Sequence, residues 1–175
     1  PEIILGGLSS VRAALKTENI PIEIDAAAEY YFDFDFERKI EEGKLLTFGK
    51  KYVLFELSFI NPQDNLQDII FKLQTCGYKP VLAHPERYNF WHHSFEKYKE
   101  IIDAGVLLQL NINSLTGHYS PATKKIAERM IEQNMISFLG SDCHHLVHTQ
   151  LMKKVVYEKH LHLLWERGTL LNYSL

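Results

Sequence analysis

The segment Gly140-Ser141-Asp142-Cys143-His144 places a carboxylate and an imidazole two residues apart. In an extended backbone, side chains two residues apart point the same way, so Asp142 and His144 can face one site while Cys143 turns aside. A hard oxygen ligand beside an imidazole suits manganese, iron or zinc better than calcium. The spacing therefore predicts that Asp142 and His144 serve two neighbouring metal ions.

A second segment with candidate chemistry is Ala83-His84-Pro85-Glu86-Arg87-Tyr88. Proline restricts the residue before it towards extended geometry, so we expect His84 to present its imidazole at the end of a strand. Arg87 carries a planar guanidinium that is suited to phosphate oxygens. The alternative is a structural histidine followed by a surface arginine.

Two glutamates complete the set of candidate ligands. Glu56 lies in the apolar run Val53-Leu54-Phe55-Glu56-Leu57. Burial of a lone carboxylate is costly and requires a cation, an arginine or a metal. The alternative for Glu56 is an exposed position on an edge strand. Glu29 follows an alanine run and is a weaker candidate, because the segment could also be a surface turn.

The elements that must position these residues follow from hydrophobic periodicity and from cap signals. Helices are predicted over residues 1–18, 34–42, 64–76, 94–104, 120–134, 146–156 and 159–166, and strands over 22–31, 52–56, 79–84, 106–112 and 135–139, with a further strand-like run between 45 and 51. Short links join the alternating strands and helices. The pattern favours one α/β domain over residues 1–175, with a largely parallel sheet and helices outside it.

The candidate residues share a position in this scheme, because each lies at or just beyond the end of a predicted strand: Glu29, Glu56, His84, Asn111 and Asp142. In α/β architectures ligands bind at the carboxyl ends of the strands, where the loops converge. We therefore expect one site at that edge. The pattern does not separate a barrel from an open sheet.

Composition excludes several classes of function. The 175 residues include 46% hydrophobic and 23% charged residues, which is ordinary for a globular domain. A net charge of -3 gives no electrostatic basis for nucleic acid as a partner. No apolar run approaches the ~20 residues that span a bilayer, so we expect no membrane insertion and a cytoplasmic location.

Six further histidines and the two cysteines are expected to play no part in the site. Six histidines are predicted to lie at the surface: His92, His93, His145, His148, His160 and His162. A cysteine-based phosphatase needs a thiolate in a loop that ends in arginine. The sixth residue after Cys143 is Thr149 and the sixth after Cys76 is Leu82, so this mechanism is rejected.

Together the motifs resemble a known family. The chain is similar to the polymerase-and-histidinol-phosphatase (PHP) superfamily, and within it to the bacterial tyrosine phosphatases encoded with capsule and exopolysaccharide export systems. The matching strings occur in the family's order over nearly the whole chain: Glu29 after an alanine run, Phe55-Glu56-Leu57-Ser58, Leu82-Ala83-His84-Pro85-Glu86-Arg87-Tyr88, Gln109-Leu110-Asn111-Ile112-Asn113-Ser114-Leu115-Thr116-Gly117 and Gly140-Ser141-Asp142-Cys143-His144.

The resemblance implies a distorted, TIM-like β/α barrel that holds up to three divalent metal ions, manganese first and iron or zinc as alternatives. It implies that Glu29 is a bridging carboxylate, and that Glu56 and His84 complete the shell of a second metal. Asp142 would bind the first metal and His144 the third. A metal cluster of this kind lowers the pKa of water towards ~7 and so supplies hydroxide for attack on phosphorus.

The resemblance also implies a substrate and its contacts. Arg87 would be catalytic, holding the phosphate and stabilising the charge that develops on it. Asn111 and Asn113 are further candidates for substrate binding. The substrate would be the phosphotyrosine tail of a cognate bacterial tyrosine kinase, and the activity would regulate synthesis and export of the polysaccharide. A homo-oligomer is left open.

The chain departs from the family in one respect. The family also takes ligands from an amino-terminal His-x-His strand, from an acidic residue soon after it and from a histidine that ends the next strand. None of these occurs in this sequence, so about two βα units of the barrel are expected to be absent. A protein that begins at Pro1 is expected to have little or no activity.

Two other functions remain open at this point. One is a PHP phosphatase of a small phosphate ester such as histidinol phosphate. The other is a non-catalytic PHP-like binding domain. The Pro-Glu-Arg-Tyr run after His84 and the acidic residues Glu29 and Glu56 favour the tyrosine phosphatase.

Overall fold

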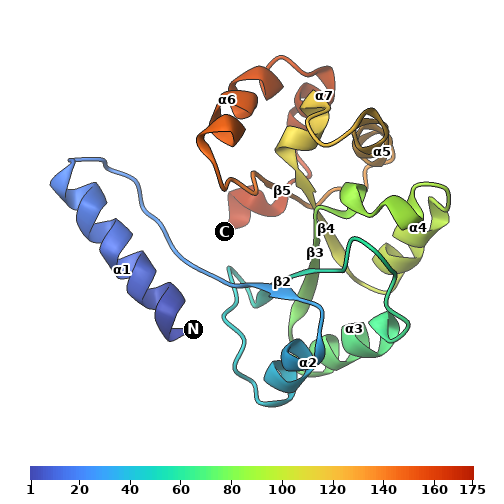
Figure 1. The fold of residues 1–175 in the computed structure, drawn as a ribbon, viewed down its shortest axis with the longest axis horizontal. Coiled ribbons are helices and arrows are strands. Elements are labelled where there is room, and N and C mark those ends of the chain that lie inside the picture. Colours follow the sequence, from blue (N-terminus) through green and yellow to red (C-terminus); the bar gives the residue numbers. More distant parts are fainter.

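A parallel sheet of five strands forms the centre of the computed structural model, which describes residues 1–175 (Figure 1). The strands are β1 (Glu29–Tyr31), β2 (Tyr52–Glu56), β3 (Lys79–Ala83), β4 (Leu107–Asn111) and β5 (Phe138–Gly140). The helices are α1 (Glu2–Thr17), α2 (Phe34–Glu41), α3 (Leu66–Thr75), α4 (Glu96–Asp103), α5 (Pro121–Glu132), α6 (Leu146–Val155) and α7 (Lys159–Arg167). Short 3-10 turns lie at η1 (Pro85–Arg87), η2 (Asn89–Trp91), η3 (Ile112–Thr116) and η4 (Leu171–Ser174).

The strands follow one another in sequence order, β1-β2-β3-β4-β5, without a reversal. Because crossovers between parallel strands are right-handed, this order places the crossover helices α2, α3, α4 and α5 on one side of the sheet. It is the order of a β/α barrel wall and differs from a doubly wound sheet, whose strand order reverses. The predicted α/β class is confirmed. The sheet is not a closed barrel, since β1 and β5 are its two edges.

Side chains alternate between the two faces of the sheet, as period-two geometry requires. On the helix-covered face, Val53 and Phe55 of β2 belong to a core cluster of 31 buried residues. On the opposite face, Tyr52, Val81 and Phe138 form a smaller cluster. Most of the apolar surface is therefore buried between the sheet and its helices. The candidate residues Glu29 and Glu56 lie on the opposite face of the sheet.

Most predicted helices are confirmed, and their local signals act as expected. Ser120 caps α5 by accepting a hydrogen bond from the Thr123 backbone N–H at 2.9 Å, with Pro121 in the first turn. The predicted cap at Ser94 is wrong, because α4 begins after Phe95 and has no side-chain cap.

The predicted strand over residues 22–31 is confirmed only at its end. Residues 22–28 form no regular ladder, and the strand β1 comprises only Glu29–Tyr31. Alternating hydrophobicity was the signal for this strand, but a strand also needs a neighbour to pair with, and only residues 29–31 pair with β2. Glu29 thus begins the strand, whereas the prediction placed it at or just beyond the strand's end.

The helix α1 was predicted correctly, but its apolar stripe is not part of the core. Leu8 is its only buried residue, while Ile4 is 37% and Val11 50% exposed. In Figure 1, α1 stands apart from the helices that surround the sheet. Neither α1 nor any other helix combines the length and the apolar character needed to cross a membrane.

Candidate metal centre

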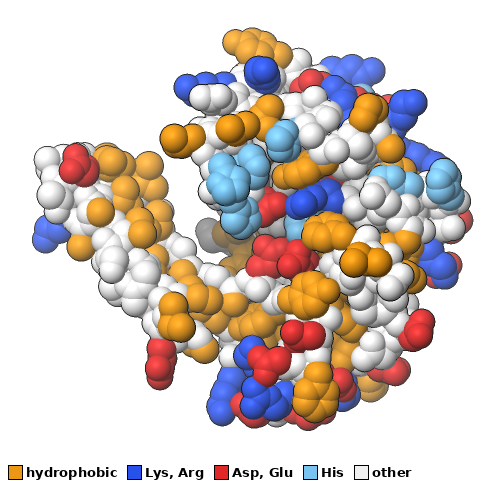
Figure 2. All heavy atoms as spheres, in the orientation of Figure 1, with side chains coloured by type: hydrophobic (Ala, Val, Ile, Leu, Met, Phe, Trp, Pro, Cys, Tyr) orange, Lys and Arg blue, Asp and Glu red, His pale blue; other side chains and the backbone are white.

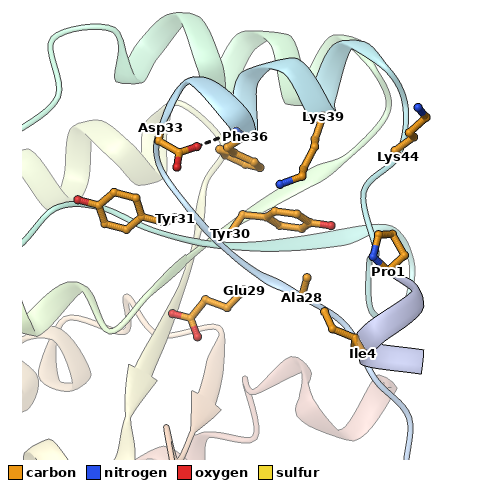
Figure 3. A pocket seen from close by; sticks show the side chains of 10 residues that line it. All are labelled: Pro1, Ile4, Ala28, Glu29, Tyr30, Tyr31, Asp33, Phe36, Lys39 and Lys44. Carbon is orange, nitrogen blue, oxygen red and sulfur yellow. Dashed lines mark hydrogen bonds between the residues drawn. The ribbon is translucent and has the colours of Figure 1, made fainter. Parts of the chain in front are cut away.

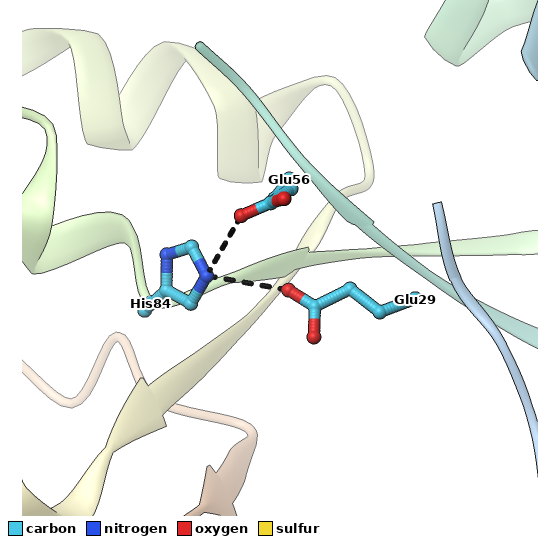
Figure 4. A group of neighbouring side chains, drawn as sticks. All are labelled: Glu29, Glu56 and His84. Carbon is cyan, nitrogen blue, oxygen red and sulfur yellow. Dashed lines mark ion pairs between the residues drawn. The ribbon is translucent and has the colours of Figure 1, made fainter. Parts of the chain in front are cut away.

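Three predicted ligands, Glu29, Glu56 and His84, meet at one point (Figure 4). The Nε2 atom of His84 lies 3.2 Å from Glu29 Oε1 and 3.4 Å from Glu56 Oε2. One ligand atom from each residue lies within 4.8 Å of the other two. The group draws one residue from β1, one from β2 and one from the end of β3, as expected for the edge of a parallel sheet.

Strand alternation explains why both glutamates face this point. Tyr52, Leu54 and Glu56 share one face of β2, and the first of them belongs to the cluster on the face away from the helices. Glu29 pairs with Leu54 in the parallel register, so it lies on the same face one pleat earlier. The extended Glu29 side chain then reaches the end of β3 (Figure 4).

The backbone of His84 differs from the prediction. Its φ of 35° and ψ of 53° are left-handed, not extended. The left-handed residue turns the chain sharply from β3 into η1, where the Arg87 N–H donates to the His84 carbonyl at 3.0 Å. This conformation costs a non-glycine residue ~1–3 kcal/mol. The strain is located at the residue that holds the two carboxylates together.

The three residues also influence one another's protonation. Burial lowers the pKa of the His84 imidazole, but hydrogen bonds to Glu29 and Glu56 outweigh it and raise that pKa to about 9. The hydrogen bond from His84 lowers the pKa of Glu56. His84 Nε2 has one hydrogen at most, whereas two carboxylate oxygens lie against it. A cation between the three groups would satisfy both carboxylates at once, so the residues fit a divalent metal.

Asp142 and His144 lie beside this group without joining it. Arg87 Nη1 donates to Asp142 Oδ2 at 2.8 Å, and His144 Nδ1 lies 3.1 Å from Asp142 Oδ1. The predicted extended geometry of the Asp-x-His segment is wrong, because Asp142 has a left-handed φ of 45°. Gly140, two residues before it, lies close to the Gln109 side chain, and a Cβ there would meet Gln109 Nε2 at 2.7 Å, so that side chain would have to move.

The two asparagines support the same edge of the sheet. Asn111 Nδ2 donates to the Tyr119 hydroxyl at 2.8 Å and to Asp142 Oδ2 at 3.3 Å. Asn113 is fully buried, and its Nδ2 donates to the Ser141 carbonyl at 3.3 Å. Asn111 is also 2% exposed. Both side chains therefore hold the loop after β5 in place, and a role for them in substrate binding stays a prediction.

Glu86 is a structural carboxylate that the sequence reasoning did not assign. It is fully buried, and its Oε1 accepts from the Asn111 N–H at 3.1 Å and from the Ser114 hydroxyl at 2.6 Å. Burial raises the pKa of Glu86, while the Ser114 hydrogen bond opposes that rise. Glu86 thereby ties the turn that carries His84 and Arg87 to the end of β4.

Comparison with known proteins agrees with this geometry. The family described as "Capsular polysaccharide synthesis, CpsB/CapC" matches residues 1–156. The chain belongs to this family. It is 27% identical over 155 residues to the tyrosine-protein phosphatase YwqE of Bacillus subtilis, covering 86% of this chain and 61% of YwqE. It is 28% identical over 151 residues to the tyrosine-protein phosphatase CpsB of Streptococcus agalactiae, covering 83% of this chain and 62% of CpsB.

A solved structure from the same CpsB/CapC family superimposes with a TM-score of 0.77 at 27% identity, over 90% of this chain and 66% of the other. Its description is "Crystal structures of YwqE from Bacillus subtilis and CpsB from Streptococcus pneumoniae, unique metal-dependent tyrosine phosphatases". This chain thus spans about three fifths of the length of the curated relatives YwqE and CpsB.

In this CpsB/CapC family member, the Glu29–Glu56–His84 group and the Arg87–Asp142 pair line one cleft of about 420 Å³. Figure 2 shows acidic, basic and histidine side chains gathered around a hollow near the middle of this face. The other residues of the lining are Phe59, Tyr119, His144, His145 and His148. The carboxylates of Glu29 and Glu56 and the guanidinium of Arg87 thus share one solvent-accessible space.

Four of these lining residues were missed or misjudged from the sequence. His145 and His148 were expected at the surface away from the site, but they line the cleft, because α6 starts directly after the loop that carries Asp142. Phe59 and Tyr119 had no chemical signal. His160 was also expected at the surface, yet it is 5% exposed between Glu128 and Glu132 of α5.

A second hollow, of about 310 Å³, lies next to the Glu29–Glu56–His84 group and shares Glu29 with it (Figure 3). Its other charged residues are Asp33, which caps α2, and the two lysines Lys39 and Lys44. In Figure 3 the Glu29 carboxylate points away from these lysines. The hollow offers no convergent set of metal ligands, so we assign the chemistry to the cleft with His84.

Proposed function

We propose that this chain carries the site of a metal-dependent phosphatase that hydrolyses phosphotyrosine on a cognate bacterial tyrosine kinase, and so regulates capsule or exopolysaccharide synthesis and export. The observation that carries the proposal is the presence, in one cleft, of the Glu29–Glu56–His84 group and Arg87. Membership of the CpsB/CapC family and similarity to relatives named tyrosine-protein phosphatases support it.

Glu29, Glu56 and His84 are the residues that would hold a divalent metal, which we take to be manganese. When bound, such a metal supplies Lewis acidity and lowers the pKa of water towards ~7. Asp142 and His144 are proposed as ligands of further ions, up to three in all. The proposal also includes the distorted β/α barrel as the architecture of the whole protein and a cytoplasmic location, where a kinase has access to ATP.

Arg87 is proposed to bind the phosphate of the substrate. Its side chain is 22% exposed in the cleft, and the hydrogen bond to Asp142 fixes its guanidinium. Only one of its five N–H donors is taken by Asp142, so others are free for phosphate oxygens. In hydrolysis a water oxygen bonds to phosphorus, the bond from phosphorus to the phenolic oxygen breaks, and a proton passes to the phenolate. Arg87 stabilises the charge on the phosphoryl oxygens throughout.

A rate comparison tests the proposal. The protein that carries this chain is assayed with Mn²⁺ on a phosphotyrosine peptide and on histidinol phosphate, and kcat/KM is measured for each. We expect faster turnover of the peptide. Faster turnover of histidinol phosphate would instead support a small-ester phosphatase, and no hydrolysis of either would support a non-catalytic binding domain.

A further inference from the structure

The cleft contains two side chains whose role the proposed chemistry does not explain. Eight of its ten lining residues are carboxylates, histidines or Arg87, and the remaining two are Phe59 and Tyr119. Contact with an apolar part of a ligand therefore depends on these two aromatic rings. We call Phe59 and Tyr119 the aromatic pair.

Both rings lie against the guanidinium that would bind phosphate. The Arg87 Cζ atom is 4.3 Å from the centroid of the Tyr119 ring and 4.8 Å from that of Phe59. Distances of this size are typical of cation–π contacts. A monoester whose phosphate is bound by Arg87 therefore has its ester group next to the aromatic pair.

Phe59 is held by its neighbours and is nevertheless exposed. Its ring stacks on His84 with a centroid distance of 5.4 Å and an interplanar angle of 24°, and it lies 5.6 Å from the Tyr88 ring. The residue is 41% exposed, which is high for a phenylalanine so firmly packed on one side. One part of the ring covers His84, and the rest is open to the cleft.

Tyr119 is held in place by a hydrogen bond and by partial burial. Its hydroxyl accepts a hydrogen bond from Asn111 Nδ2 at 2.8 Å, and the residue is half-buried. Burial raises the pKa of the Tyr119 hydroxyl, so the ring stays a neutral phenol. The aromatic pair is thus preorganised, and binding a ligand costs little side-chain entropy.

We propose that Phe59 and Tyr119 form a selectivity clamp that receives the aryl ring of a phosphate monoester and favours it over an alkyl group of the same charge. The inference rests on the proposed function and extends it by naming the residues that choose the substrate class. Aromatic rings pack edge-to-face or offset, which stabilises an aryl ligand beyond the area it buries. An alkyl chain lacks this contribution.

Binding of two non-hydrolysable ligands tests the clamp without turnover. Phenylphosphonate and ethylphosphonate share one headgroup, and their Kd values for the Mn²⁺-loaded protein can be measured by calorimetry. We expect the unaltered protein to prefer phenylphosphonate. The variant Phe59→Leu should bind phenylphosphonate about fivefold more weakly, equivalent to ~1 kcal/mol, and ethylphosphonate within about twofold of the unaltered protein.

Two further variants sharpen the test. Tyr119→Phe keeps the ring and loses the hydrogen bond from Asn111, so the preference for phenylphosphonate should persist. Phe71→Leu is the matched control, because Phe71 is 70% exposed on α3 and lies outside the cleft. It should leave both Kd values unchanged.

Equal weakening of both ligands by Phe59→Leu would overturn the clamp, because the ring would then act only by positioning Arg87. Absence of an aryl preference in the unaltered protein would overturn it as well. The proposed function fails separately: a protein that prefers phenylphosphonate yet does not hydrolyse phosphotyrosine retains the clamp and contradicts the enzyme.

Discussion

Arg87 Nη1 donates a hydrogen bond of 2.8 Å to Asp142 Oδ2, and this bond joins the turn after β3 to the loop after β5. The residues are 55 positions apart, and their side chains are 22% and 19% exposed. Because both are partly shielded from water, each fixes the orientation of the other more firmly than a surface pair would. The candidate phosphate-binding residue and a candidate metal ligand are therefore coupled.

The variant Asp142→Ala tests this coupling. It removes a proposed ligand and the partner that orients Arg87, so we expect kcat/KM on phosphotyrosine to fall by more than the ~10–100-fold that loss of an outer-shell partner costs. The circular dichroism spectrum should be unchanged. Asp103→Ala is the matched control, since Asp103 is exposed at the end of α4. Near-normal turnover would remove Asp142 from the site.

Replacement of Glu56 by glutamine should weaken metal binding. The amide keeps the shape of the side chain but loses the charge that faces His84 Nε2. We expect the Kd for Mn²⁺, measured by calorimetry, to rise at least ~10-fold, as for altered metal sites in general. Glu166→Gln, an exposed change on α7, should leave it unaltered. An unchanged Kd in the Glu56 variant would place the metal elsewhere.

The contrast between Glu56 and His84 shows how far the sequence could predict this site. Glu56 follows an alternating strand, so its face is determined by Tyr52 and Leu54. His84 lies at the end of β3 beside the glutamates, as predicted, but its backbone is left-handed and not extended. This conformation depends on tertiary hydrogen bonds that hold η1, such as the one from the Asn111 N–H to Glu86. Local rules such as the restriction before proline do not include such bonds.

Local sequence pattern also could not predict which strands pair with each other or which residues lie next to one another in the cleft. Residues 22–28 alternate like a strand but have no continuous partner, and pairing is a property of the whole sheet. Phe59 lies against Arg87 through contacts between two different loops. Hydrophobic period and cap signals predicted the α/β class and most helices, because those depend on nearby residues.

The pH dependence of metal binding follows from His84. Hydrogen bonds to Glu29 and Glu56 raise the pKa of its imidazole to about 9, so the ring is protonated at neutral pH in the metal-free protein. A metal must displace this proton, and its apparent affinity should rise about tenfold per pH unit below that pKa. Calorimetric titrations with Mn²⁺ at pH 6, 7 and 8 would measure the slope. A flat profile would contradict His84 as a ligand.

The same shift predicts the stability of the metal-free protein. Because the folded-state pKa of His84 is raised above 6.5, its contribution to the free energy of unfolding is fully present below pH 6.5 and is lost as pH rises through about 9. The pKa of Glu56 is lowered from 4.5, so its contribution is present above that pH and is lost on acidification. Urea unfolding with a chelator should therefore show a decline from pH 6.5 to 9, which His84→Gln should reduce.

Tyr88 connects the core to the site, and its hydroxyl offers a test of stability alone. The residue is fully buried; its hydroxyl accepts from the Leu57 N–H at 2.9 Å and donates to the Ala83 carbonyl at 3.1 Å. Tyr88→Phe leaves both backbone groups without that partner, which should lower the free energy of unfolding by ~1–3 kcal/mol in urea titrations. Tyr157→Phe, at an 85% exposed position, is the control and should change it little. Equal stability of the two variants would mean that other groups satisfy Leu57 and Ala83 and that the hydroxyl does not hold β2 to β3.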